Sequence, residues 1–497
     1  MADPIDEKHQ YTDSDDIKKK SQDLERNVTL GEGELQDPIF KHADPNDGDE
    51  ALKAFAGHDG EVIVMTPEME KKLLRKIDWN LMPVCLLSDD PHALCCVWAQ
   101  LSRQDHTFLC EHYGMKTSLD LKGDNYQWLG SMFYIGYLVW DLGGTLCCMA
   151  ATSNFAGAVA VRFFLGVFEA AVTPGFTLFT SQWYTQKEQG LRTGIWFSFN
   201  GFAQIFGGLV AYGISVGVKK HGSTIASWKI VFLAIGLLTV AIGCIFLYFM
   251  PDNQLNAKFL TPQERLMAVE RIRKNQQGVG NKHFKMYQLK EALADPVTWA
   301  FVFYGLVADI PNGGISNFFS QLIVSFGYTP DESLLYGTPG GAVEVIALIL
   351  CGYLGDKYGH RLLISISGLL IAMLGMILIV ALPLSNDSGR LAGYYLTQAS
   401  PTPFTALLSM ISSNVAGNII GPQVFRPSDA PRYKPAEITI IVCYGVCALD
   451  VAFISWYYNR MNKKNEAIRA APGYKKLDKQ EFLDLTDKEN HEFVYAL

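Results

Sequence analysis

The sequence predicts an all-α polytopic membrane protein, and the distribution of charge is the observation that carries this prediction. The 497 residues are 49% hydrophobic and 19% charged. However, no charged residue occurs in four long runs, which are 193–218, 230–250, 362–384 and 391–411. A helix needs about 20 apolar residues to cross a bilayer core, and a soluble core helix seldom runs that far without a polar face. Several such runs in one chain therefore indicate membrane-spanning helices.

The first predicted element is a basic amphipathic helix at the membrane surface, over residues 67–79. It follows a polar, acidic stretch with few aromatic residues, which is typical of disorder. Apolar spans are then expected at approximately 128–151, 155–183, 193–218, 228–250, 297–324, 334–354, 361–384, 391–415 and 436–458.

A long polar segment separates the fourth of these spans from the fifth. It contains Thr261 followed by Pro262 and then Glu264, which predicts a capped helix that begins there. Lysine and arginine cluster in this segment and in the C-terminal tail, so both are expected in the cytoplasm. The predicted domains are an N-terminal tail (1–76), a first helical bundle (77–251), a central loop (252–295), a second bundle (296–458) and a C-terminal tail (459–497). Two bundles joined by a large loop suggest a transporter with its site at the midplane between them.

Five blocks of sequence resemble a known family. Residues 352–361 (GYLGDKYGHR) resemble the cytoplasmic-loop signature of the major facilitator superfamily. Four longer blocks are similar to its fungal anion:cation symporter branch, the allantoate-permease-like proteins: RFFLGVFEAAVTPGF (162–176), EQGLRTGIWFSFNG (188–201), YYLTQASPTPF (394–404) and GPQVFRPSDAPRYKPAEITIIVC (421–443).

The resemblance implies a major facilitator fold of two pseudo-symmetric helical bundles, with twelve spans, of which about nine are recognisable here. It also implies symport of protons with an organic anion such as allantoate, ureidosuccinate, nicotinate, pantothenate or biotin. The expected location is the plasma membrane, and the expected form is a monomer. Uniport or export of the same anion is equally compatible with the sequence.

The loop signature supplies five predicted gating residues, which are Gly352, Gly355, Asp356, Gly359 and Arg361. The glycines allow a tight turn between two helices. Asp356 is expected to cap a helix or to pair near Arg361, in a contact that breaks when the two halves rock.

Three stretches depart from the family pattern. The first is 85–113, where Asp89, Asp90 and Arg103 would each cost about 2.5–3.5 kcal/mol in a bilayer, so this stretch should not span. The second is near 140–148, where the family's second and third spans are fused. The third is after Gly417, where most of the eleventh span is missing. These departures indicate either an error in the predicted coding sequence or an alternative function, a truncated or degenerate membrane protein that does not transport and that regulates another.

Charged residues inside spans are functional candidates, because burying them in a membrane is costly. Arg162 and Glu169 lie about two turns apart on one helix face, and they could attract an anion and exchange a proton. Glu344 is the corresponding acid of the second half. Asp309 lies in ADIPNGG, a pattern typical of a helix that unwinds at a transporter site. For each residue, a structural pair or a helix cap is the competing interpretation.

Polar candidates complete the predicted site for substrate binding or coupling. Asn200 and Gln204 share a helix face, and Gln398 lies beside two prolines. Hydrogen bonding between helices is the alternative for all three. The sequence contains no phosphate loop or catalytic triad, and its His and Cys spacing matches no zinc pattern well. We therefore expect no enzyme activity, cofactor, metal site or nucleic-acid partner.

Overall fold

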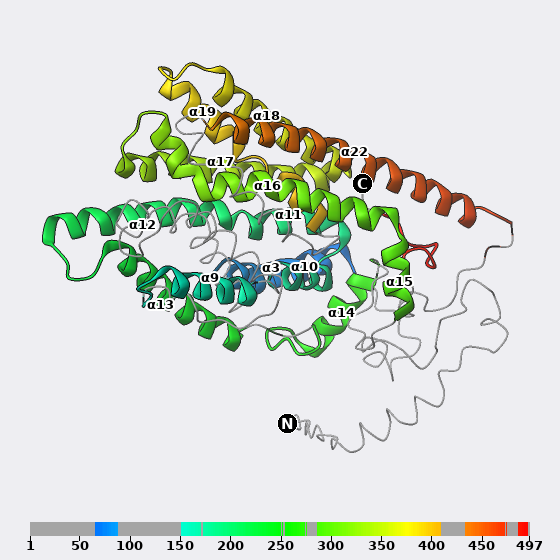
Figure 1. The fold of residues 1–497 in the computed structure, drawn as a ribbon. Coiled ribbons are helices and arrows are strands. Elements are labelled where there is room, and N and C mark those ends of the chain that lie inside the picture. Colours follow the sequence, from blue (N-terminus) through cyan, green and yellow to red (C-terminus); the bar gives the residue numbers. More distant parts are fainter. Residues whose placement is uncertain are drawn as a thin grey trace, which may run out of the picture. The chain divides into compact units, whose positions relative to one another are not determined.

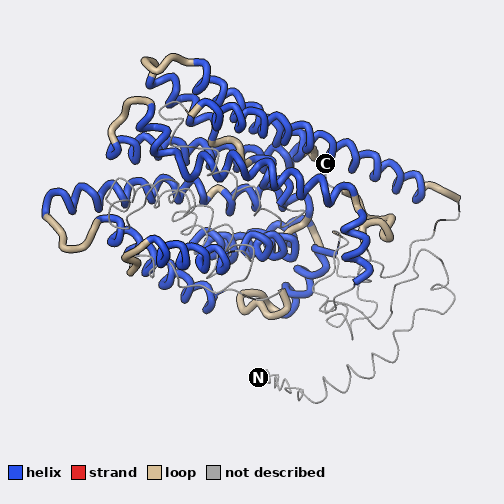
Figure 2. The backbone as a smooth tube through the Cα atoms, viewed as in Figure 1, coloured by secondary structure: helices blue, strands red, loops and turns tan. Residues whose placement is uncertain are grey.

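The computed structural model describes residues 65–87, 151–169, 172–249, 251, 254–273, 275, 286–408, 433–472, 474 and 486–495. All regular secondary structure within these residues is helical, as Figure 2 shows. The all-α prediction is therefore confirmed for the described part of the chain. The three stretches that depart from the family pattern, apart from Cys85–Leu87, lie outside the described residues, as does the predicted span 128–150.

The described helices before the central loop are labelled in Figure 1. They are α3 (Pro67–Leu87), α9 (Phe155–Glu169), α10 (Val172–Trp183), α11 (Gln186–Phe197), α12 (Phe199–His221) and α13 (Ser227–Phe249). The predicted helix at 67–79 is confirmed and continues to Leu87. It is amphipathic, since Ile77 and Leu81 are buried while Lys71, Lys72 and Arg75 are exposed. The predicted span 193–218 falls within α11 and α12, which meet at Ser198.

The helices after the central loop form the second half of the chain. They are α16 (Pro296–Ser325), α17 (Pro330–Tyr358), α18 (Arg361–Ala381), α19 (Asp387–Thr397), α20 (Thr402–Leu408) and α22 (Lys434–Arg469). The described part of the predicted span 391–415 consists of two helices, because α19 ends at Thr397 and turns separate it from α20. Pro401 and Pro403 explain the break, since proline lacks the N–H that a helix interior uses and restricts the residue before it.

Several described helices are suited to a lipid environment. The segments Gln186–His221, Pro330–Tyr358, Arg361–Ala381 and Lys434–Arg469 are long and apolar enough to cross a membrane, and the bent pair of α15 (Met286–Ala294) and α16 meets the same criteria as one broken span. On α18, Leu363, Leu370 and Leu374 are about half exposed. Lipid chains can cover such apolar faces, as expected for membrane-spanning helices. The expected nine of twelve spans stay a prediction.

The chain forms two compact units. The larger contains residues 74–251, 289–462 and 495–497, and the smaller contains 1–73, 252–288 and 463–494. The smaller unit includes α14 (Pro262–Arg273) and the start of α15 (Met286–Ala294). Two of its three segments, 252–288 and 463–494, belong to the parts of the chain predicted to lie in the cytoplasm.

The smaller unit has its own apolar core and an internal ion pair. Leu73, Leu260, Val269 and Ile272 are buried in it, and Arg271 lies 3.6 Å from the carboxylate of Glu70. The predicted cap of α14 is confirmed: the Glu264 N–H donates to the Thr261 hydroxyl, and the Thr261 N–H donates to the Glu264 carboxylate at 2.9 Å.

Candidate functional site

The most extensive helix contact in the described structure joins α11 and α12 of the first half to α17 of the second half. Three glycines lie against carbonyl oxygens of α17. A side-chain carbon on Gly194 would lie 2.7 Å from the Leu348 oxygen, so only glycine permits this approach. The opposed pairs recur every seven residues on both helices and are here called the inter-half seam: Gly194–Leu348, Gly201–Gly341 and Gly208–Leu334.

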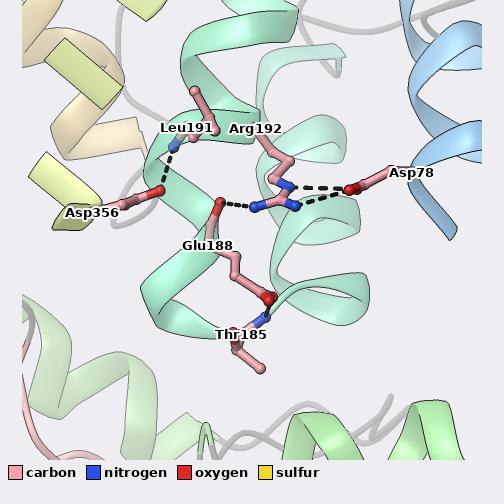
Figure 3. A network of polar contacts seen from close by, with 6 residues as sticks. All are labelled: Asp78, Thr185, Glu188, Leu191, Arg192 and Asp356. Carbon is pink, nitrogen blue, oxygen red and sulfur yellow. Dashed lines mark hydrogen bonds and ion pairs between the residues drawn. The ribbon is translucent and has the colours of Figure 1, made fainter. Parts of the chain in front are cut away.

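Two of the predicted gating residues lie at one end of this seam. Asp356 and Arg361 form an ion pair, with 2.7 Å between carboxylate and guanidinium. The other carboxylate oxygen of Asp356 accepts a hydrogen bond from the Leu191 N–H at 2.7 Å (Figure 3). Arg361 also donates to the carbonyl oxygen of Gln186. The predicted pairing is confirmed, and both residues additionally contact the main chain of α11.

The three predicted gating glycines each meet a separate steric demand. Gly352 extends the seam, since a side-chain carbon there would lie 2.6 Å from the Gly190 oxygen. A side-chain carbon on Gly355 would lie 2.8 Å from the Arg361 side chain. Gly359 ends α17 with a φ of 72°, in the left-handed region that favours glycine.

A second ion pair near this end belongs to the first half alone. Arg192 donates to the Asp78 carboxylate at 2.9 Å, its guanidinium lies over the Tyr184 ring, and it also donates to the Glu188 oxygen (Figure 3). Thr185 and Glu188 cap the start of α11. This network fixes the helix terminus whose Leu191 N–H meets Asp356.

At the other end of the seam, Lys219 in the last turn of α12 pairs with Asp331 in the first turn of α17. The two charged atoms are 2.5 Å apart, and the side chains are 58% and 37% exposed. The inter-half seam therefore ends in polar contacts on both sides.

A buried polar cluster lies between these ends. The Gln204 amide nitrogen donates to the Tyr394 hydroxyl at 2.8 Å and to the Gly337 oxygen at 3.3 Å. A side-chain carbon on Gly340 would lie 3.5 Å from the Gln204 nitrogen and 3.2 Å from Gln398. The structure thus brings the predicted residues Gln204 and Gln398 to the same glycine of α17, from opposite halves.

Two further predicted residues lie one helical turn from this cluster. Asn200 precedes Gln204 on α12 and is 5% exposed. Glu344 follows Gly340 on α17, is 3% exposed, and makes no hydrogen bond or ion pair with any described residue. A buried carboxyl without a cation beside it is costly to ionise.

Arg162 is buried on α9, and its guanidinium lies 6.0 Å from the ring centre of Phe232 on α13. The side chain of its predicted partner Glu169 lies outside the described residues.

The prediction for Asp309 was wrong in one respect. The residue is buried, but α16 runs unbroken through Pro311 and the two glycines that follow it. A proline costs a helix only one internal hydrogen bond when the neighbouring helices hold the chain in place. The segment does not unwind.

Sequence reasoning missed two features of the second half. Tyr394 accepts the Gln204 hydrogen bond, and its ring stacks on Phe319, yet a tyrosine in an apolar run is usually a packing residue. Arg390 and Glu437 form an ion pair at 3.7 Å, and both are almost completely buried. Each residue lies next to an apolar run, so the opposite charges of Arg390 and Glu437 were the sequence feature that could have indicated a buried ion pair.

Comparisons with known proteins place these features in a family. The family model of the Major Facilitator Superfamily matches residues 118–423. Uncharacterized transporter C417.10 of Schizosaccharomyces pombe is 37% identical over 473 aligned positions, which cover 87% of this chain and 90% of that protein. The allantoate permease of Saccharomyces cerevisiae is 34% identical, with 90% of each chain covered. The thiamine pathway transporter THI73 of the same yeast is 32% identical, with coverage of 86% and 87%.

These identities confirm the resemblance to fungal allantoate-permease-like proteins. They extend over most of each chain, and the matched family model covers more than half of this one. The described helices agree with an integral membrane protein of that family, whose members move solutes and are not enzymes. The chain belongs to the Major Facilitator Superfamily of membrane transporters.

Proposed function

We propose that this chain is a proton-coupled symporter that carries a small organic anion across the plasma membrane by alternating access. The observation that carries the proposal is the buried cluster of Gln204, Tyr394 and Gln398, with Glu344 one helical turn away on α17. It joins the two halves between two sets of polar end contacts. In this scheme, substrate binds at the cluster while one end of the seam parts and the other stays closed.

Coupling follows from the energetics of anion uptake. A cell interior that is negative opposes entry by about 2.3 kcal/mol per charge per 100 mV. A proton carried with each anion removes that cost. Glu344 is the proposed proton carrier, because a carboxyl buried without a cation is held most cheaply in its neutral form. Glu169 and Asp309 are proposed as secondary acids of the same pathway.

The cluster also favours one class among the candidate anions. The amide nitrogen of Gln204 donates both of its hydrogen bonds, and the bond to the Gly337 carbonyl fixes the orientation of the amide group. The amide oxygen of Gln204 is consequently buried with no hydrogen-bond partner among the described residues. An N–H group on the substrate would satisfy this oxygen. A ureide such as allantoate carries N–H groups beside its carboxylate, whereas nicotinate carries none.

Other predicted residues complete the proposed site. Asn200 and Gln398 would orient the carboxylate or ureide, and Arg162 would attract the anion to the first half. Asp356 and Arg361 would hold one end of the seam closed until the halves move. The similarity to an allantoate permease and to a thiamine pathway transporter is compatible with this range of small solutes.

The test is uptake of radiolabelled allantoate into proteoliposomes, with an acidic exterior and without a pH gradient. We expect accumulation to need the gradient. Glu344→Gln should abolish accumulation but retain exchange of labelled for unlabelled substrate, because exchange needs binding without net proton movement. Glu466→Gln, an exposed change on α22, is the matched control. Accumulation that ignores the gradient, or a Glu344→Gln variant that accumulates normally, would contradict the proposal.

The substrate class is tested by competition. Unlabelled allantoate should inhibit uptake of the radiolabelled substrate at a lower concentration than nicotinate does in the parent protein. In Gln204→Leu the two inhibitory concentrations should lie closer together. Equal competition by the two anions in the parent protein would show that the orphan oxygen of Gln204 does not select N–H groups.

One observation favours a second function, a membrane protein that does not transport. The alignment with C417.10 spans 473 positions, but it covers only 87% of the 497 residues of this chain, which is about 432 residues. Roughly forty positions of the alignment therefore have no counterpart here. This agrees with the spans that the sequence predicts to be damaged. The alternative would be supported if transcripts match the sequence at 85–113, 140–148 and 415–420 and the reconstituted chain takes up no substrate.

A further inference from the structure

The last described helix continues well beyond its apolar part and contacts the C-terminal segment 486–495 there. Four side chains project from one face of α22 at spacings of four, three and four residues, which places them in a row along the helix. We call this row the docking face, and its members are Tyr458, Asn462, Asn465 and Arg469.

Three of these side chains bind the main chain of the C-terminal segment. Asn462 makes two hydrogen bonds to Tyr495: its amide nitrogen donates to the Tyr495 carbonyl and its amide oxygen accepts from the Tyr495 N–H, both at 2.8 Å. Asn465 donates to the Phe493 carbonyl at 3.3 Å, and Arg469 donates to the His491 carbonyl at 2.7 Å. The contacts of Tyr495 lie within the larger unit, and the others lie within the smaller.

The spacing explains why this arrangement fits. A turn closed by the Phe493 N–H and the Asn490 carbonyl at 3.0 Å leads into Val494 and Tyr495, and the three bound carbonyls belong to alternate residues of the segment. Steps of three and four residues along a helix measure about 4.5 and 6 Å, so flexible side chains of α22 can reach these carbonyls one after another. The side chain of Tyr495 is anchored as well, since its ring stacks on Tyr458 with 4.7 Å between centres and is 7% exposed.

The segment has a second attachment, to the central loop. Glu489 accepts a hydrogen bond at 3.5 Å from the hydroxyl of Tyr287 in the first turn of α15. A capping box between Thr486 and Glu489 shapes the turn at the start of the segment. The segment therefore contacts both the extension of α22 and the helix that leads into α16.

We propose that residues 486–495 are a docking segment, a ligand carried by the chain itself, which binds the docking face through its main chain and holds α15 in place through Glu489. The docking face recognises backbone carbonyls together with the ring and the N–H of Tyr495. This assignment is independent of the transported solute.

The test supplies the segment in trans. A chain that ends at Leu485 is purified in detergent and titrated with a fluorescent peptide of residues 484–497, and binding is followed by anisotropy. We expect saturable binding that weakens at least tenfold when the peptide is N-methylated at Tyr495. N-methylation at Val494, whose side chain is half exposed and whose N–H makes no hydrogen bond with a described residue, is the matched control and should change affinity less than twofold.

Hydrogen exchange on the full-length chain tests the proposal even if the shortened chain folds poorly. Hydrogen exchange should show protection of the Tyr495 amide in the parent protein and its loss in Asn462→Ala. Amides of α15 should exchange faster in the shortened chain and recover when the peptide is added. Absence of peptide binding, equal effects of the two N-methylations, or an unprotected Tyr495 amide in the parent protein would each overturn the proposal.

Discussion

The protein contains two glycine seams that look alike in packing but differ at their ends. The inter-half seam joins α11 and α12 to α17. A second one, here called the intra-half seam, joins α18 to the α19–α20 region through Gly368, Gly375 and Gly393. A side-chain carbon on Gly393 would lie 2.7 Å from the Gly375 oxygen, so both seams bring main chains into direct contact.

The intra-half seam lies beside a fully buried ion pair. Arg390, which donates to the Ile379 oxygen of α18 at 3.4 Å, pairs with Glu437 on α22, and neither side chain is more than 1% exposed. By contrast, Lys219 and Asp331 at one end of the inter-half seam are substantially exposed. Water can take over the partners of an exposed pair, whereas breaking a buried pair leaves a charge without solvent. We infer that the inter-half seam is suited to parting during transport and the intra-half seam to staying closed.

The largest expected effect concerns the buried pair. Arg390→Leu should lower the free energy of unfolding by about 3–5 kcal/mol, because it removes the cation that pairs with the buried Glu437 carboxylate. Thermal unfolding of the purified protein in detergent measures the loss. The double change Arg390→Leu with Glu437→Leu should recover much of it, since no buried charge then remains. A single variant as stable as the parent would show that the pair is not what holds the second half together.

The next effect compares glycines of the two seams. Gly201→Leu should reduce uptake by about 100-fold, because forcing a side chain into the packed contact costs up to about 3 kcal/mol and the halves can no longer approach. It should leave the yield of folded protein nearly unchanged, because each half can still pack alone. Gly375→Leu should instead reduce the yield of folded protein, measured by size-exclusion chromatography. Equal loss of folded protein in both variants would remove the distinction between the seams.

A smaller effect is expected at the predicted gate. Asp356→Asn keeps the side-chain shape but removes the negative charge that pairs with Arg361 and strengthens the hydrogen bond from the Leu191 N–H, a loss of about 1.5 kcal/mol. We expect about a tenfold change in uptake rate with thermal stability unaltered. The conservative variant Asp356→Glu should restore part of the rate. A large loss of stability in Asp356→Asn would instead assign this contact to folding.

The smallest effect belongs to the exposed pair at the other end. Lys219→Ala should change uptake by less than about fivefold, because exposed ion pairs contribute at most about 1 kcal/mol. Uptake by the parent protein and by Lys219→Ala should be measured at low and at high salt. Salt screens the exposed ion pair, so the difference in uptake rate between the two proteins should vanish at high salt. A difference that persists at high salt would mean that Lys219 has another role.

Sequence reasoning succeeded where the interacting residues are close along the chain. The cap of α14 at Thr261 and the pairing of Asp356 with Arg361 follow from spacings of a few residues. The partner of Asp356 on α11 is 165 residues away, and no local pattern indicates it. For the same reason Gln204 was recognised as a polar candidate but Tyr394 was not. The span at 391–415 is predicted from hydropathy, and hydropathy does not locate the turns that separate α19 from α20.

The seven-residue repeat of the inter-half seam restricts the kind of motion that the halves can make. Seven residues of helix measure about 10.5 Å, so any shorter translation of α12 along α17 would drive a side chain into a carbonyl oxygen at every level of the seam at once. Rotation about a pivot within the seam keeps one level matched while the ends separate in turn. Both end contacts are closed in this structure, so Lys219 and Asp331 should separate while the Leu191–Asp356 hydrogen bond holds, and the reverse should occur in the opposite state.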